Sequence, residues 1–257
     1  MKKQVLLIVL FAIGSLVAYA QEYKKNVSKK DGKLSVYIDD SKVEITGYNG
    51  SELQIIARGY EKPPERAQGL KALYNTAIDN TNIGLYVTEE DGEVKIEKAS
   101  REDIDYVIKV PQSMNVTIHE TNWHGDEFRV KNIAGEIEID AKGSDIHIEN
   151  VSGPIVANTT NGDITIIFSN LAQDKPNSIK SVNGFIDLTM PATSKCDIKL
   201  RALNGEIYSN FEITYSSAEF KGVRVGGGGK IEGQINNGGV ELQLNTINDN
   251  IYLRKAE

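Results

Sequence analysis

The sequence predicts an all-β protein built as a single-stranded β-helix, also called a β-solenoid. The first observation is the motif Asn-Gly-x-Ile, which occurs at residues 161–164, 183–186 and 204–207. The second is a nine-residue spacing between isoleucines that follow a glycine-containing turn, namely Ile137, Ile146, Ile155 and Ile164. Self-similarity at a fixed period is the sequence signature of stacked repeats, so we expect one short structural unit per period.

Each unit reads as a turn followed by a short strand. The side chains of Ile164 and Ile166 share one face of such a strand, whereas Asp163 and Thr165 share the other. One face is therefore expected to be buried and the other hydrated. We expect coils of about 18–22 residues around a narrow, filled interior. At a recurring corner, each asparagine can stack on its copy and bond to it through the side-chain amide.

The alternative architecture is an antiparallel sandwich, because Asn-Gly also closes two-residue hairpins. The motif returns in the same order relative to its turn, Asn-Gly and then Ile, as equivalent stacked corners would require. This constant order favours the solenoid. The general preference for right-handed crossovers favours a right-handed coil.

The chain begins with a pattern typical of a signal peptide over residues 1–20. Lys2 and Lys3 precede an apolar run over 5–18, and Ala18-Tyr19-Ala20 offers the small residues of a cleavage site. A retained N-terminal anchor is the alternative interpretation. We expect residues 21–257 to form a single β-solenoid domain, with 21–32 as a flexible N-terminus. The mature protein is expected to be exported, with no membrane span, and to be periplasmic, cell-surface or extracellular.

Alternating strand patterns also fill residues 33–57, 83–98 and 103–118. The exception is 61–82, where Pro63-Pro64 begins a short helical excursion near 64–77, with Leu70, Leu73 and Ala77 at helical spacing. Such a segment could cap one end of the stack. Residues 169–178 read as a loop inserted between coils, and 225–230 as a flexible glycine-rich turn.

The formal net charge is −7, and loss of the two leader lysines makes it more negative. This charge disfavours nucleic acid and anionic lipid as partners. The single cysteine, Cys196, excludes an intrachain disulfide. Its alternating surroundings predict a buried, inert thiol, since a nucleophile would need a partner base that is not evident nearby.

Few residues indicate chemistry. The glycine run fails as a phosphate loop because Arg224 and Ile231 stand at required Gly and Ser/Thr positions. His119 and His124 lie with Trp123 in residues 119–127, and His147 lies apart. A metal or sugar site is one interpretation of 119–127, but the spacing matches no zinc signature, so a turn is favoured.

Outward carboxylates are expected to form an acidic stripe along the stack. A hydrated face is favoured over a calcium site as its interpretation. The carboxylates are Glu136, Glu138, Asp140, Asp145 and Glu149. Glycosidase carboxylates could be among them, but the sequence selects no pair. Three outward aromatics, Phe185, Tyr208 and Tyr252, could contribute contact area or be scattered surface residues. We predict no catalytic, cofactor-binding or metal-ligating residue, and the sequence leaves the ligand-binding residues open.

Several segments together resemble a bacterial group of exported β-solenoid domains known as adhesins, or head domains of auto-transporter-like adhesins. They are "DNTNIGLYV", "GEIEI", "TTNGDITIIFS", "SIKSVNGFIDLTMPA", "ALNGEIYSNF" and "GGVELQLNTINDNIYLRK". The resemblance spans nearly the whole mature chain and implies a β-helical fold and a cell-envelope setting. It carries no catalytic residues.

The predicted function is that of a non-enzymatic envelope protein, an adhesin or binding scaffold that presents an extended β-surface to a protein or glycan. A polysaccharide lyase or hydrolase on a β-helix is one alternative. An envelope signalling or scaffold component is another. No cofactor is expected.

Overall fold

Two large β-sheets form the protein in the computed structural model, which describes residues 21–67, 69–70, 77–215 and 229–256. Within these residues the ten-stranded sheet has the order β1 (Gln21–Asn26), β4 (Glu52–Arg58), β7 (Asp105–Pro111), β3 (Val43–Tyr48), β9 (Glu127–Lys131), β11 (Asp145–Val151), β13 (Ile164–Phe168), β15 (Ile186–Met190), β21 (Ile251–Lys255) and β17 (Ile207–Ser209). The eleven-stranded sheet has the order β18 (Thr214–Tyr215), β19 (Gly229–Ile235), β16 (Cys196–Ala202), β20 (Val240–Thr246), β14 (Asn177–Ser181), β12 (Ile155–Thr159), β10 (Ile137–Asp140), β8 (Asn115–Glu120), β2 (Lys33–Ile38), β6 (Glu93–Lys98) and β5 (Leu85–Glu90).

The predicted all-β class is confirmed. The only helical element in the described ranges is the 3-10 helix η1 (Glu65–Ala67). No helix in the described part of the chain is long and apolar enough to cross a membrane. The predicted signal peptide, residues 1–20, lies outside the described residues.

The nine-residue spacing arises because successive strands alternate between the two sheets. Ile137 and Ile155 lie opposite each other in the eleven-stranded sheet, and Ile146 and Ile164 do so in the ten-stranded sheet. Both pairings are parallel, so each strand pairs with the strand two steps further along the chain. The antiparallel sandwich is therefore wrong for these central strands.

Inward side chains form continuous apolar columns between the sheets. One column in the ten-stranded sheet contains Ile146, Ile164, Ile186 and Ile251, each at most 1% exposed. Burial of one such side chain contributes about 1.5–3 kcal/mol, and repetition over many strands stabilises the fold without disulfides.

In the repeated Asn-Gly, the glycine and the asparagine have separate structural roles. A Cβ atom on Gly162, Gly184 or Gly205 would lie 2.0, 2.0 or 1.9 Å from a backbone carbonyl oxygen of the neighbouring layer. None of these three glycines, nor the asparagine before each, has a positive φ. Glycine is needed here because the layers approach closely, and the turn is not a two-residue hairpin.

The corner asparagines form a ladder of side-chain amides, as predicted. Asn183 Nδ2 donates to Asn161 Oδ1 at 2.7 Å, and Asn248 Nδ2 donates to Asn183 Oδ1 at 2.7 Å. Asn204 Nδ2 then donates to Asn248 Oδ1 at 2.8 Å. The ladder runs in the spatial order 161, 183, 248, 204, which is not the order of the sequence.

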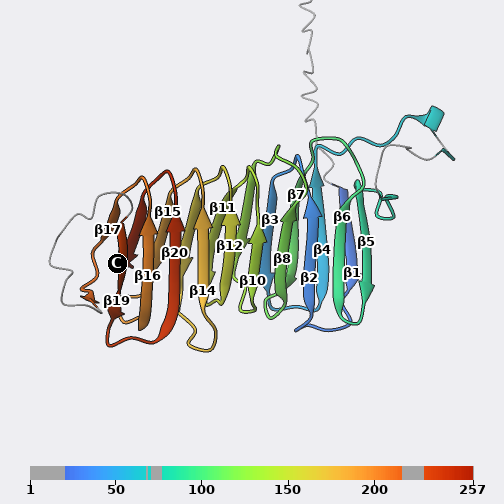
Figure 1. Cartoon of the computed structure of the whole chain (residues 1–257). Helices are drawn as coiled ribbons and strands as arrows, with labels where there is room; N and C mark the ends of the chain where they lie inside the picture. The colour runs from blue at the N-terminus through green and yellow to red at the C-terminus, as the bar shows by residue number, and fades with distance from the viewer. Residues whose placement is uncertain (1–20, 68, 71–76, 216–228, 257) are drawn as a thin grey trace, which may run out of the picture.

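The spatial order departs from the sequence order at both ends of the molecule. The strand pair β20–β21 lies between β14–β15 and β16–β17. Figure 1 shows β20 between β16 and β14. The pair β2–β3 is likewise inserted between β6–β7 and β8–β9. Repeats stacked in chain order would place Ile207 directly on Ile186. This expectation is wrong, because Ile251 lies between them.

Among the described strands, antiparallel pairing finishes three of the four sheet edges, whereas β17, at the fourth, pairs parallel with β21. β1 pairs with β4, β4 with β7, and β5 with β6, while β19 pairs with β16 and β18. Residues 21–26 of the predicted flexible N-terminus thus form β1.

The predicted helical excursion near 64–77 is not seen as a cap. Its described part contains only the turn of η1, none of whose residues is buried, and η1 projects away from the sheets (Figure 1). Leu70 is 73% exposed, and residues 71–76 lie outside the described residues. The loop predicted at 169–178 ends earlier, because β14 begins at Asn177. Most of the glycine-rich turn at 225–230 lies outside the described residues.

Candidate binding surfaces

An aromatic cluster lies on the outer face of the ten-stranded sheet at its β17 end. We name Phe185, Tyr208 and Tyr252, with Asp187 and Arg254, the aromatic platform. The inserted strand β21 creates it, because Tyr252 lies opposite Asp187 on one side and Tyr208 on the other. The alternation predicted that the three rings point outward; the structure adds that they meet.

Two of the three rings stack face to face, and the third ring meets this stack edge-on. The Tyr208 and Tyr252 ring centroids are 5.4 Å apart with a 10° interplanar angle, and Phe185 meets Tyr252 edge-on at 6.2 Å. Tyr208 is 52% exposed, so the outer part of the stack faces solvent. Such aromatic pairs are each worth about 0.5–1.5 kcal/mol beyond burial, which fixes the ring orientations.

On the side of Tyr252 away from Tyr208, Asp187 forms an ion pair with Arg254. Arg254 Nε donates to Asp187 Oδ1 at 2.8 Å and Oδ2 at 3.1 Å. The Arg254 guanidinium also lies 5.3 Å from the Tyr252 ring centroid, within range of a cation–π contact. The hydrogen bond to Asp187 raises the pKa of Arg254, so this side chain is cationic at every physiological pH.

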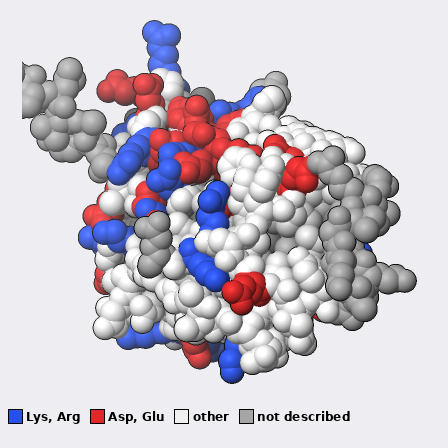
Figure 2. All heavy atoms as spheres, turned by 90° about the vertical axis from the view of Figure 1, so that its left-hand side faces the viewer, with Lys and Arg blue, Asp and Glu red and all other residues white. Residues whose placement is uncertain are grey.

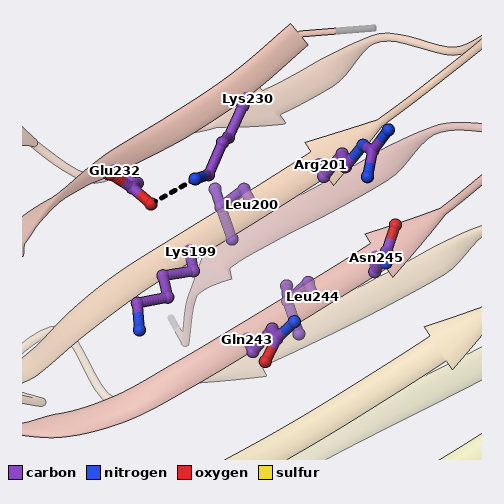
Figure 3. A pocket seen from close by; sticks show the side chains of 8 residues that line it. All are labelled: Lys199, Leu200, Arg201, Lys230, Glu232, Gln243, Leu244 and Asn245. Atoms are coloured by element: carbon purple, nitrogen blue, oxygen red, sulfur yellow. Dashed lines mark ion pairs between the residues drawn. The ribbon is translucent and has the colours of Figure 1, made fainter.

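A second surface is a shallow basic hollow of about 490 Å³ on the outer face of the eleven-stranded sheet (Figure 3). Basic side chains project from β16 and β19 beside amides from β20. The lining residues are Lys199, Leu200, Arg201, Lys230, Glu232, Gln243, Leu244 and Asn245.

Both lysines that line this hollow have carboxylate partners. Lys230 Nζ lies 2.7 Å from Glu232 Oε1, and Lys199 Nζ lies 2.5 Å from Glu241 Oε2. The hydrogen bond to Glu241 raises the pKa of Lys199, and the one from Lys230 lowers the pKa of Glu232. No ion pair within the described part of the chain involves Arg201. Figure 2 shows that this end of the molecule carries both acidic and basic side chains. The local charge of the hollow therefore depends on which of its basic side chains are paired with carboxylates.

A smaller hollow of about 280 Å³ adjoins the first, because Asn245 lines both. It continues across β14, β12 and β10 and is lined by Asp140, Ala141, Asn158, Thr159, Thr160, Lys180, Ser181, Val182, Asn245 and Ile247. Neither hollow was predicted from the sequence. Their residues lie far apart in the chain and meet because β20 is inserted.

The predicted acidic stripe is wrong. Glu138 lies in the eleven-stranded sheet, opposite Val156 and Thr117, whereas Glu149 lies in the ten-stranded sheet. A nine-residue step changes the sheet, so Glu138 and Asp140 lie on a different surface from Asp145 and Glu149. Glu136 is also paired, with Lys175.

The histidine-rich segment 119–127 is divided between different environments. His119 points outward and stacks on Tyr37 at 5.0 Å. Glu120 is buried and accepts backbone N–H groups of Gly143 at 2.8 Å and Ser144 at 3.3 Å, so it stabilises the next corner. Among the residues with described positions, no group of three His, Cys, Asp or Glu could hold a metal ion.

The remaining candidates have structural surroundings. His147 Nε2 lies 3.8 Å from Glu149 Oε2 on an outward face, and His124 lies in the loop before β9. Cys196 is fully buried, as predicted, and burial raises the pKa of its thiol to about 12. A thiol with this pKa is not a nucleophile at neutral pH.

No protein-family model and no curated protein sequence matches the chain. Among the solved structures that match the chain, two cover nearly all of it. A "putative cell adhesion protein" from Clostridium sporogenes ATCC 15579 has 13% identity and a TM-score of 0.45, over 92% of this chain and 100% of its own. A "putative adhesin" from Bacteroides fragilis NCTC 9343 has 12% identity and a TM-score of 0.40, over 91% of this chain and 96% of its own. At this similarity neither protein's function carries over to this chain.

Proposed function

We propose that the protein is an exported, non-enzymatic binding protein of the cell envelope, with an adhesin-like role. The observation that carries the proposal is the solvent-facing Tyr208–Tyr252 stack with Arg254 beside it. Tyrosine and arginine are enriched among the residues that dominate protein–protein binding energy. The platform is therefore the contact site, and a partner protein is its ligand.

The platform is suited to binding because its side chains are already ordered. Each ring is fixed on a strand or corner of the sheet, and the Asp187–Arg254 pair supports Tyr252 from the opposite side. A surface ordered before contact loses little side-chain entropy on association. This preorganisation favours a stable contact over a transient one.

The architecture proposed for this role is a β-solenoid, with the two sheets as two faces of one coil. Its support is the regular alternation of central strands between sheets and their parallel pairing. A right-handed coil follows the general crossover preference. Export rests on the leader pattern of residues 1–20, with 21–257 as the mature domain.

Site-specific photo-cross-linking tests the proposal directly. A photoreactive amino acid placed at Tyr208 in the full chain, expressed in the native cell, should capture a defined protein partner. The matched control carries the same group at Tyr86, a half-buried outward tyrosine on the eleven-stranded sheet. Identical products at both positions, or none at 208, would contradict a protein-binding platform, and capture of glycan alone would reassign the ligand.

The enzymatic alternative is tested separately. Purified protein is incubated with acidic and neutral polysaccharides, and new reducing ends or unsaturated products are measured. We expect no turnover. Sustained cleavage would replace the binding function with a polysaccharide lyase or hydrolase.

A further inference from the structure

We propose that the two adjoining hollows form one groove, which binds a linear, carboxylate-bearing polysaccharide across the strands. The groove runs over β19, β16, β20, β14, β12 and β10, from the basic hollow to the smaller one. Asn245 is the shared residue, and the two volumes are about 490 and 280 Å³. This site lies on the opposite sheet from the aromatic platform and does not depend on it.

The strand register places the polar groups of the groove in one row. Arg201 lies opposite Asn245, which lies opposite Lys180. The row continues through Asn158 to Asp140. Since neighbouring strands are about 4.8 Å apart, Arg201 and Lys180 are spaced by about 10 Å with an amide between them. A row of this kind fits a repeating polymer better than a compact ligand.

The charges in the row favour an anion. Lys199 and Lys230 are neutralised by Glu241 and Glu232, but Arg201 and Lys180 have no ion pair among the residues described. Asp140, at the β10 end, is the carboxylate of the row, so Arg201 and Lys180 together with Asp140 leave a net positive charge on a protein whose formal net charge is −7. An arginine guanidinium can bind a carboxylate through two parallel hydrogen bonds, and a lysine provides a second point of attraction.

The uncharged side chains that line the groove indicate which class of anionic polymer it binds. Asn158, Gln243 and Asn245 present amides, and Thr160 adds a hydroxyl, all suited to sugar hydroxyl groups. None of the described residues that line the groove is aromatic. Single-stranded nucleic acids are held largely by stacking of bases on aromatic rings, so these surroundings favour an acidic glycan.

The test is equilibrium binding of the full mature chain to polygalacturonate, with neutral dextran, oligothymidylate and polyglutamate as comparison ligands. We expect binding to polygalacturonate that weakens as salt is raised, with dextran unbound and the other two polyanions bound more weakly. The double variant R201Q/K180Q should lose affinity by about tenfold or more. Thermal unfolding of each variant checks the fold, and the salt dependence tests the charge argument without any variant.

The matched control is R58Q/K109Q, which removes one arginine and one lysine from exposed positions on the ten-stranded sheet. Its affinity should stay within about twofold of wild type. The proposal is overturned by absent or salt-insensitive polygalacturonate binding, by equal losses in both double variants, or by equally tight binding of oligothymidylate or polyglutamate. Tyr208→Ala should leave this affinity unchanged, which separates failure here from failure of the platform.

Discussion

Replacement of one isoleucine in the shared interior tests how much stability each layer contributes. Ile186 is 0% exposed and lies between Ile164 and Ile251 in the ten-stranded sheet. Ile186→Ala removes its γ and δ carbons and leaves a cavity. The sheet hydrogen bonds keep the neighbouring layers at a fixed spacing, so the cavity has little freedom to collapse.

We expect Ile186→Ala to lower the free energy of unfolding by about 3–5 kcal/mol, the upper part of the range for such substitutions. Ile167 provides a matched control on the adjacent strand β13, because its side chain is outward and 37% exposed. Ile167→Ala should cost about 1 kcal/mol or less.

Urea unfolding followed by circular dichroism measures both variants against wild type. The prediction is a large shift of the midpoint for Ile186→Ala and a small one for Ile167→Ala, with similar slopes. Equal shifts would refute the assignment of Ile186 to a close-packed interior column.

Three further predictions use other features of the fold. Gly184→Ala should destabilise the protein by about 1–3 kcal/mol, because the new Cβ would lie 2.0 Å from the Gly162 carbonyl oxygen. Urea unfolding measures this change. An unchanged stability would contradict the explanation that the glycine is needed for close approach of the layers. Cys196, whose thiol pKa is raised by burial to about 12, should react with a thiol reagent only after denaturant is added; rapid labelling of the folded protein would contradict its burial. For Glu127, burial raises the pKa, but hydrogen bonds from Lys42 and Arg129 outweigh it and hold the pKa below its ordinary 4.5. Its stabilising effect is therefore present above that value and lost as pH falls through the lower folded pKa. Glu127→Gln should flatten the acid part of the stability–pH profile, and an unchanged profile would refute this.

Much of the local structure was predictable from the sequence because it depends on short-range patterning. The alternation of Ile164 and Ile166 with polar residues identifies the buried face of a strand. The recurrence of asparagine at each corner likewise predicts the amide ladder, which the Asn161–Asn183 hydrogen bond confirms.

The order of the layers was not predictable in the same way. The Ile251 and Ile207 strands carry the same pattern, so either could pair with the Ile186 strand. The inserted position of β21 depends on the packing of whole layers, a non-local property that no motif records. For the same reason the sequence indicated three outward aromatics but not that Tyr208 and Tyr252 stack.

The groove shows the same limit. Lys180, Arg201 and Asn245 are ordinary outward residues when the chain is considered alone. They become one row only after β20 is placed between β14 and β16. The acidic stripe was wrongly predicted for a related reason. The pattern of side chains within one unit does not show which of the two sheets that unit joins.

Disulfide trapping of the layer order tests the central structural claim most directly. Ser178 on β14 and Lys199 on β16 both lie opposite Gln243 on the inserted strand β20. Adjacent strands place Cα atoms about 5 Å apart, within disulfide range, whereas strands two apart are about 10 Å apart and outside it. With Cys196 replaced by alanine, oxidation should therefore cross-link S178C/Q243C and K199C/Q243C but not S178C/K199C. A cross-link in S178C/K199C, with none to position 243, would show that the layers follow the sequence order and would contradict the insertion on which both surfaces depend.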